Sequence, residues 1–459
     1  MRREMLSEQA SLPTGATRSL TRRAMGRLLQ LEQPVAPRSE AEFVADVHRH
    51  YRWNFAVNLL DVVNFWIGLG FLSSTTIVPL FVSKLTPNPL FIGLAAMIAQ
   101  GGWYLPQLFT ANMLERLARK KPVVVNLGFF TERLPMWVIV LSAPAALHST
   151  SLALFLFFLG YAWHGLGAGA VATSWQELIA RCFPVQRRGR FMGVSFFLGG
   201  GAGALAALLS RRFLGVYPFP SNFFHIFLGA AVCITVSWFF LALTREPVQA
   251  VTAPRRSNRE FFAALPAIVR NDANYRRFLL ARLAMVVGWM ASGFVTVAAV
   301  QRLGVPDSRV GFYTAELLIG QTAANLTLGL LADRFGNKLT LEIGAVAACL
   351  AFTLAWAAPS PAWYDAVFVL MGVANGAGVV SGLMIVLEFA PPDRRTTYLG
   401  LTNTVLGVAS MTGPLLGALL VGLSYQLLFA ISAVANVIAF VILHWWVREP
   451  RKTHRSHGE

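Results

Sequence analysis

The chain has 459 residues, of which 55% are hydrophobic and only 13% are charged. A soluble domain carries about 25% charged residues, so this composition excludes an ordinary soluble domain and indicates an integral membrane protein. The three cysteines, Cys182, Cys233 and Cys349, are far apart in the sequence. They form no closely spaced pair, so neither a metal site nor a redox motif is expected.

The first 53 residues hold nine Lys or Arg residues but no long apolar run. A signal peptide needs such a run, so 1–53 is expected to be a cytoplasmic tail with short amphipathic helices. Ser39 and Glu42 have the spacing of a capping box, which predicts that a helix begins directly after Ser39.

Twelve later stretches are apolar enough to cross a bilayer, which takes about 20 residues of helix. Helices are expected because lipid cannot satisfy free backbone polar groups, and the alternation typical of a membrane β-barrel is absent from these stretches. The predicted fold is an all-α membrane protein with spans at 54–81, 89–110, 122–145, 151–175, 191–214, 222–243, 278–300, 308–331, 338–358, 362–387, 398–422 and 425–447.

Lys and Arg residues are distributed very unevenly between the two sides of these spans. With the amino terminus inside, 32 of them lie in inner segments and 5 in outer loops. The positive-inside rule therefore predicts a multi-pass protein of the cytoplasmic (inner) membrane with both termini in the cytoplasm. The net charge of +17 is then explained by topology and by contact with anionic membrane lipid, so nucleic acid is not expected as a partner.

The two halves of the sequence repeat each other. FPVQRRGRFMG at 183–193 matches APPDRRTTYLG at 390–400, and both halves end in the tripeptide REP, at 245–247 and 448–450. We therefore expect two parallel, pseudo-symmetric six-helix bundles, an architecture typical of transporters. Their predicted limits are 54–244 and 278–447, with a cytoplasmic linker at 245–277 and a cytoplasmic tail at 448–459.

Residues 329–338 read GLLADRFGNK, in which charges of both signs lie between two apolar runs. A looser copy, ANMLERLARKK, occupies 111–121, the same place in the first half. With these motifs the chain resembles the major facilitator superfamily over about residues 54–450. The matching residues are Gly329, Asp333, Arg334, Gly336 and Lys338 in the second copy, and Arg116, with Glu115 in place of the aspartate, in the first.

The resemblance implies that these loops control a gate at the cytoplasmic side. Gly329 is expected to let a neighbouring helix come close, and Asp333 to accept hydrogen bonds from a helix amino terminus. The alternative is that the charges only mark a short cytoplasmic loop. The same two interpretations, gate partner or inside-positive anchor, apply to Arg187, Arg188, Arg394 and Arg395.

Charged residues within the first-half spans are candidates for function, because inserting them into a bilayer costs about 2.5–3.5 kcal/mol each. Asn58 and Asp61 lie on one stripe of the first span and are expected to contact substrate or proton, or to form a local polar cap. Glu132 and Arg133 are adjacent and therefore poor partners for each other on a helix. They are expected to form an intramembrane network, with Arg133 and Asp61 as a testable pair.

The second half supplies further candidates for a translocation site. Glu316 is a candidate proton carrier, with a hydrogen-bonded structural role as the alternative, and Arg282 is expected to extend towards the cytoplasmic surface. Aromatic rings and amides in a cavity suit an amphipathic organic substrate. The other candidates in the spans are Trp163, His164, Trp289, Gln321, Asn325 and Asn375.

These features predict a secondary active transporter of a small organic molecule that works by alternating access. No nucleotide-binding motif is visible, and neither enzyme activity, cofactor nor metal is expected. Titratable groups within the spans favour proton coupling, and many aromatics with few charges favour efflux. Uptake of a metabolite or nutrient is the alternative, and a non-transporting receptor is a remote one. We expect the protein to be a monomer.

Overall fold

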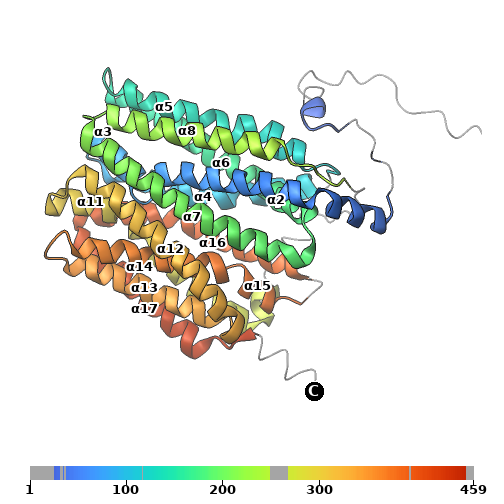
Figure 1. Ribbon diagram of the computed structural model, residues 1–459. Helices are drawn as coiled ribbons and strands as arrows, with labels where there is room; N and C mark the ends of the chain where they lie inside the picture. The colour runs from blue at the N-terminus through green and yellow to red at the C-terminus, as the bar shows by residue number, and fades with distance from the viewer. Residues whose placement is uncertain are drawn as a thin grey trace, which may run out of the picture.

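In the computed structural model, residues 25–31, 35, 38–115, 117–248, 267–391 and 394–450 are described. Most of the 1–53 tail, Arg116, part of the 245–277 linker and residues 451–459 therefore lie outside the described part of the chain. The helices of the first half, blue to green in Figure 1, lie together on one side, and those of the second half, yellow to red, lie on the other.

Every element in the described part of the chain is a helix. The first half contains α2 (Glu40–Phe71), α3 (Ile77–Leu85), α4 (Pro89–Glu115), η1 (Val123–Leu127), η2 (Phe129–Arg133), α5 (Leu134–Ala145), α6 (Thr150–Cys182), α7 (Val185–Val216) and α8 (Ser221–Ala242). The second half contains α10 (Ala273–Gly288), η3 (Trp289–Ala291), α11 (Ser292–Leu303), α12 (Asp307–Phe335), α13 (Asn337–Ala357), α14 (Trp363–Ser381), α15 (Met384–Phe389), α16 (Arg395–Leu423), α17 (Tyr425–Val441) and η5 (Ile442–Trp446).

Among the described residues, 11 helical segments are long and apolar enough to cross a membrane. The predicted second span corresponds to α4, which has 27 residues. The predicted all-α membrane fold is confirmed.

The first span differs from its predicted limits of 54–81. The capping box is confirmed, since the Ser39 backbone N–H donates to Glu42 Oε2 at 2.9 Å and the Glu42 N–H donates to Ser39 Oγ at 3.2 Å. The helix that begins there runs without interruption to Phe71, and α3 is separate. The break falls on the polar run 73–76, whose hydroxyls offer the backbone alternative hydrogen bonds.

Four other predicted spans are not uniform α-helices, and one of them, the twelfth, ends in the π-helical segment η5. The third span begins with two π-helical segments, η1 and η2, before α5. A 3₁₀ turn at Trp289–Ala291 joins α10 to α11, and α14 is separated from α15 at residues 382–383. Such irregularities often mark positions where a helix bends or serves a function.

The sequence repeat is also visible in three dimensions. Phe191 packs edge-on against Phe55 with ring centroids 5.6 Å apart. Its counterpart Tyr398, 207 positions later in the sequence, packs against Tyr275 at 4.6 Å. In both halves an aromatic residue near the start of the first predicted span therefore contacts one at the start of the fifth.

A second pair of contacts ties the first helix of each half to its REP tripeptide. The Asn54 side chain donates to the Arg245 carbonyl and accepts from its N–H, both at 2.9 Å. Asn274 makes the same two bonds to Arg448, at 3.0 and 2.8 Å. Each asparagine therefore joins the beginning of its half to its end, and we refer to these contacts as the two asparagine clamps.

The two halves meet along two helix pairs, α7 with α12 and α4 with α16. Small residues allow the close approach, as expected for helices in a membrane. A Cβ added at Gly200 would lie 2.2 Å from Thr322 Oγ1, and one added at Gly93 would lie 2.7 Å from the Pro414 carbonyl oxygen. The interface between the halves therefore depends on glycines, which leave room for close contact, as well as on apolar packing.

Candidate functional site

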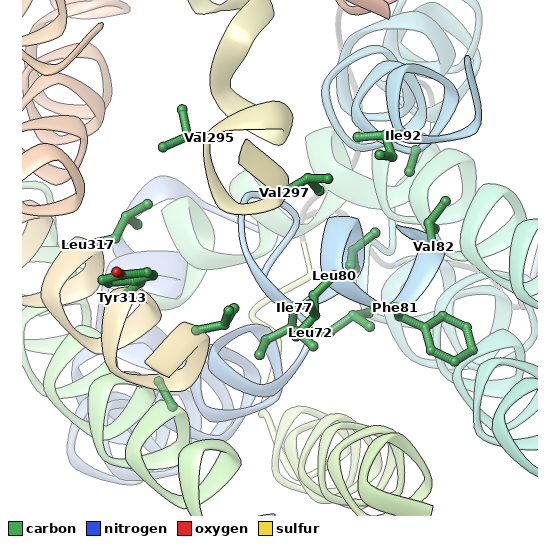
Figure 2. Packing of buried hydrophobic residues seen from close by; sticks show 14 of the residues in the cluster. Leu72, Ile77, Leu80, Phe81, Val82, Ile92, Val295, Val297, Tyr313 and Leu317 are labelled. Atoms are coloured by element: carbon green, nitrogen blue, oxygen red, sulfur yellow. The ribbon is translucent and has the colours of Figure 1, made fainter. Parts of the chain in front are cut away.

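At one end of the molecule the halves are closed by an apolar cluster. Its residues come from both halves, including Phe81 of α3, Val297 of α11 and Leu317 of α12. Figure 2 shows Leu80 of α3, Val297 of α11 and Leu317 of α12 in the same cluster. Because Phe81 and Leu80 are completely buried, this end has a dry, packed core.

Polar contacts add to the seal at the same end. The hydroxyls of Thr76 and Thr314 lie 2.6 Å apart, and Thr296 donates to the Thr75 carbonyl at 3.0 Å. Lys84 pairs with Asp307 at 2.7 Å. Each of these contacts joins one half to the other, so this closed end resists separation of the halves.

At the opposite end, a buried carboxylate organises the first half. Glu246 of the REP tripeptide accepts hydrogen bonds from the backbone N–H groups of Lys120 and Lys121, at 2.7 and 2.9 Å. Arg181 lies 3.5 Å from the same carboxylate, and Lys120 pairs with Glu177 at 2.7 Å. Glu246 therefore caps the helix that follows the 111–121 loop and connects it to α6.

Burial shifts the pKa values of two groups in this cluster. Desolvation raises the pKa of Glu246, although hydrogen bonds from Lys120 and Lys121 oppose the shift. Desolvation lowers the pKa of Lys121, against the attraction of Glu246. Both residues lie outside the membrane-spanning helices.

The second half repeats this arrangement with a different turn. Gly336 has φ +98, a conformation that side chains other than glycine rarely adopt, and a Cβ there would lie 2.6 Å from the Glu449 carboxyl group. Glu449 accepts a 3.3 Å hydrogen bond from the Lys338 N–H. The glycine of the motif therefore serves to bring the turn against the carboxylate of the second REP tripeptide.

The other motif residues are placed as follows. A Cβ added to Gly329 would meet no atom of the described residues within 4 Å, so the close helix contact expected there is absent from the described part of the structure. Asp333 is exposed and has an interaction partner, and the Arg334 guanidinium lies 5.3 Å from the Phe335 ring. The side chains of Glu115 and Arg395, and all of Arg116, lie outside the described part of the structure.

The basic residues of the 183–193 segment have separate roles. Arg188 donates to the carbonyls of Phe183 and Ala180, at 3.1 and 2.5 Å, and so caps the end of α6. Arg187 stacks over Tyr51, with 4.7 Å to the ring centroid. Its counterpart in the second half, Arg394, is exposed and also has an interaction partner.

Within the membrane, the first half encloses a charged cluster among its own helices. Asp61 accepts a 2.6 Å hydrogen bond from Ser237 of α8, and Arg133 is close enough for its charge to interact with Asp61. His164 Nδ1 lies 2.8 Å from the Glu132 carbonyl. The cluster therefore connects α2, η2, α6 and α8.

Two expectations about this cluster require correction or detail. Glu132 and Arg133 are in contact, so the expectation that they are poor partners is wrong. The segment is π-helical, and the side-chain directions of an α-helix do not apply to it. The Thr244 hydroxyl, two residues after α8, donates to Asn58 Oδ1 at 3.3 Å. Together with the bond from Ser237 to Asp61, it places the Asn58–Asp61 stripe against the end of α8.

The second half has amides where the first has charges. Asn375 donates to Gln321 at 3.0 Å, and Asn325 Oδ1 is buried without a hydrogen-bond partner among the described residues. Glu316 Oε2 is likewise buried and unpartnered in the described part of the chain. Nearby, Arg309 pairs with Asp365 at 2.5 Å.

The remaining candidates lie apart from these groups. Trp163 is 39% exposed on α6, on a different face from the buried His164. Trp289 lies in the 3₁₀ turn and packs against Phe352, with ring centroids 6.2 Å apart. Arg282, on α10, does not reach a carboxylate among the described residues, and its Nη1 lies 3.9 Å from Met285 Sδ.

Four organising residues were missed at the sequence level, namely Asn274, Glu246, Glu449 and Lys120, and the partner of Asn54 was not predicted. The REP repeat was the available signal for the two glutamates. The two asparagines fall at different positions relative to the YR dipeptides at 51 and 275. Aligning the two halves on these dipeptides therefore does not place Asn54 and Asn274 at equivalent positions.

Known proteins resemble the chain in both sequence and structure. A sequence model of the Major Facilitator Superfamily matches residues 277–459. An uncharacterized MFS-type transporter, YfkF of Bacillus subtilis (strain 168), is 25% identical over 69% of this chain and 77% of its own. The MFS thioclapurine efflux transporter tcpA of Claviceps purpurea (strain 20.1) is 30% identical over 31% of this chain and 26% of its own.

A solved structure supports the same fold. A mutant of the nucleoside transporter NupG superposes with a TM-score of 0.64 and 16% identity, covering 84% of this chain and 98% of its own. At this level of identity the likeness concerns the fold alone.

Proposed function

We infer that this chain is a member of the major facilitator superfamily, which it resembles in sequence and fold, and that it is a secondary active transporter that moves a small organic molecule by alternating access. We further propose that protons drive it, in the direction of efflux. The observation that carries the proposal is the asymmetry of the two ends. Contacts such as Lys84–Asp307 join the halves at the closed end, whereas Glu246 and Glu449 bind loops of their own half at the other.

The distribution of Lys and Arg supports the orientation. The basic loops lie at the end that carries Glu246 and Glu449, which we place in the cytoplasm. The closed end is then the outer one, and the conformation is inward-facing. In the opposite conformation the contacts of Thr76 and Lys84 with the other half must break, and the 329–338 loop must approach the other half. Open space at Gly329 leaves room for that approach.

The buried cluster of the first half supports proton coupling. Asp61 is held by Ser237 and lies within the influence of Arg133. A proton arriving on Asp61 removes one of these two opposite charges and therefore changes the attraction between α2 and η2. A titratable carboxylate between helices of a membrane bundle is the usual basis of a proton relay.

The proposed efflux direction rests on two observations. The described interior presents aromatic rings and amides more often than charges, a lining that suits amphipathic compounds. One relative, tcpA, carries the description of an efflux transporter. If the flux measurement shows the compound moving into the cytoplasm, the direction is uptake and not efflux.

The test is flux through purified full-length protein in proteoliposomes with an imposed pH gradient. A panel of neutral, anionic and cationic small organic molecules is supplied on either side, and internal pH is followed with a fluorescent dye. We expect at least one compound to move, with protons flowing in the opposite direction. Asp61→Asn should abolish the proton flux. Asp46→Asn should not, although Asp46 is a carboxylate on the same helix as Asp61, because Asp46 is paired with Arg38 near the start of that helix. Failure of every compound to move would overturn the proposal.

A further inference from the structure

We propose that Arg282 is the substrate-recognition residue for an anionic group, so that the transported molecule is a small organic anion carrying a carboxylate or phosphate. This inference rests on the proposed transport function and adds the substrate class. The structural basis is a guanidinium that lies within a membrane span, at the interface of the two halves, with no carboxylate among the described residues to balance it.

The position of Arg282 is defined by three helices. It is the tenth residue of α10, which places it about 14 Å along the helix from its start. A Cβ added at Gly382, where α14 ends, would lie 3.2 Å from Arg282 Nη2. Tyr104 of α4, in the other half, is close enough to interact electrostatically with Arg282. The guanidinium therefore lies between the two halves and not on the lipid-facing side of one of them.

The contacts of Arg282 leave its charge unbalanced. Its Nε is buried and has no hydrogen-bond partner in the described part of the chain. The only partner of the guanidinium among these residues is the thioether of Met285, at 3.9 Å from Nη1. A thioether is a weak acceptor that carries no charge.

A charge in this position is costly unless something compensates it. Placing an arginine within a span is unfavourable, and proteins usually pair such a group with a carboxylate or a carbonyl. The other intramembrane arginine, Arg133, follows this rule, since it contacts Glu132. Arg282 departs from it, so the missing counter-charge is best supplied by the ligand.

The shape of the guanidinium indicates which ligand group fits. Its planar array of N–H donors matches the two oxygens of a carboxylate or phosphate, and arginine cannot lose its charge under ordinary conditions. Tyr104 adds a phenol that can donate to the same anion or pack against an apolar part of the molecule. The predicted substrate therefore joins an anionic head to a small apolar or aromatic body.

A structural role is the competing explanation for Arg282. The last carbonyls of α14 lie near Gly382, where the Gly382 N–H bonds to the Gly378 carbonyl, and a helix carboxyl end attracts cations. If this were the whole role, replacing Arg282 would lower thermal stability but leave charge selectivity unchanged.

The first measurement needs no variant. Purified full-length protein in nanodiscs of neutral lipid is titrated with 3-phenylpropanoate, 3-phenylpropanamide and 3-phenylpropylamine, which share one skeleton and differ in charge, and with inorganic phosphate. We expect the carboxylate to bind at least tenfold more tightly than the amide and the amine. Equal or tighter binding of the amide or amine, or no binding by either anion, overturns the inference.

Variants then assign the selectivity to Arg282. Arg282→Gln should weaken carboxylate binding by about 10- to 100-fold, the range expected for a charged hydrogen bond, and leave amide binding unchanged. Arg282→Lys should retain the preference for the anion. Arg276→Gln is the matched control, because Arg276 is an exposed arginine on the same helix. Unchanged carboxylate affinity in Arg282→Gln contradicts the inference.

Two further outcomes separate the inference from what it rests on. If proteoliposomes move a neutral or cationic compound but no anion, transport stands and anion recognition fails. If no compound moves at all, both fail. The titration is then repeated in nanodiscs with anionic lipid. If the anionic lipid abolishes carboxylate binding, the occupant of the site is a lipid headgroup. That result would overturn the assignment to a transported solute.

Discussion

The two halves of the molecule share a frame but differ in where they put charge. Both use an asparagine clamp, at Asn54 and Asn274, and both pack an aromatic pair at the same corner. In the first half the intramembrane charges lie among its own helices, around Asp61. In the second half Arg282 faces the other half. The frame is therefore set by backbone geometry, which the repeat retains, while the polar residues are free to specialise.

This comparison suggests a division of labour. A charge enclosed within one half changes the packing of that half when it gains or loses a proton. A charge between the halves is exposed to whatever enters between them. We therefore assign coupling to the first half and substrate recognition to the second, and the following variants test how far the shared frame extends.

The largest effect is expected at the REP glutamates. Glu246→Ala should destabilise the protein by about 3–5 kcal/mol, because the backbone N–H groups of Lys120 and Lys121 lose the buried carboxylate that accepts their hydrogen bonds. Glu449→Ala should cost only about 1 kcal/mol, since its hydrogen bond to Lys338 is 3.3 Å long. Thermal unfolding of the two purified variants gives the comparison. Equal losses would show that the two loops are energetically equivalent.

The asparagine clamps should show a smaller difference. Asn54→Ala should cost about 2 kcal/mol, because Asn54 is completely buried and the Arg245 backbone groups lose both partners. Asn274→Ala should cost about 1 kcal/mol, since Asn274 is only partly buried and water can replace it. Unfolding midpoints measured in the same detergent test the order. A greater loss in Asn274→Ala would contradict it.

A substitution that makes the second half resemble the first should be milder still. Tyr275→Phe places the ring found at Phe55 into the second aromatic pair and removes the hydroxyl that contacts Thr402 at 2.8 Å and the Tyr398 carbonyl at 3.0 Å. The expected cost is about 1 kcal/mol, because Thr402 keeps its own bond to Tyr398. Thermal unfolding measures it, with Tyr217→Phe as an exposed control. A loss no larger than that of the control would show that the hydroxyl does not stabilise the second half.

The smallest expected effect is a pH dependence from Glu246. Its pKa is raised above 4.5 by burial, so the folded state binds this proton more tightly than the unfolded state. The corresponding stability is present below pH 4.5 and is lost as the pH rises through the raised pKa. Glu246→Gln should therefore flatten the fall in unfolding midpoint above pH 4.5. An unchanged slope would show that Glu246 does not contribute to it.

The sequence was sufficient for the helical membrane fold and for the repeat. Apolar runs of span length are readable one segment at a time, and Phe191 and Tyr398 are paired by an offset of 207. It was also sufficient for the capping box at Ser39, since that motif depends on residues three positions apart. It was insufficient for the limits of the first span, where the polar run 73–76 breaks the helix.

The candidate site was readable only in part. The intramembrane charges were recognisable because charges in apolar runs are costly. Their partners were not, since Asp61 meets Ser237 from a helix 176 positions away. The contact between Glu132 and Arg133 was not predicted either, because it depends on a π-helical backbone that no residue pattern indicated.

Composition, span length, charge bias and repeat determined by themselves that this is a helical membrane protein with two related halves. Each of these properties follows from the order and type of residues along the chain, so it can be predicted without knowing any tertiary contact. Tertiary structure alone decided that one end is closed, that the REP glutamates cap the loops and that Arg282 meets no counter-charge in the described part of the chain. Those facts depend on which distant side chains meet across helices, and packing between helices settles that.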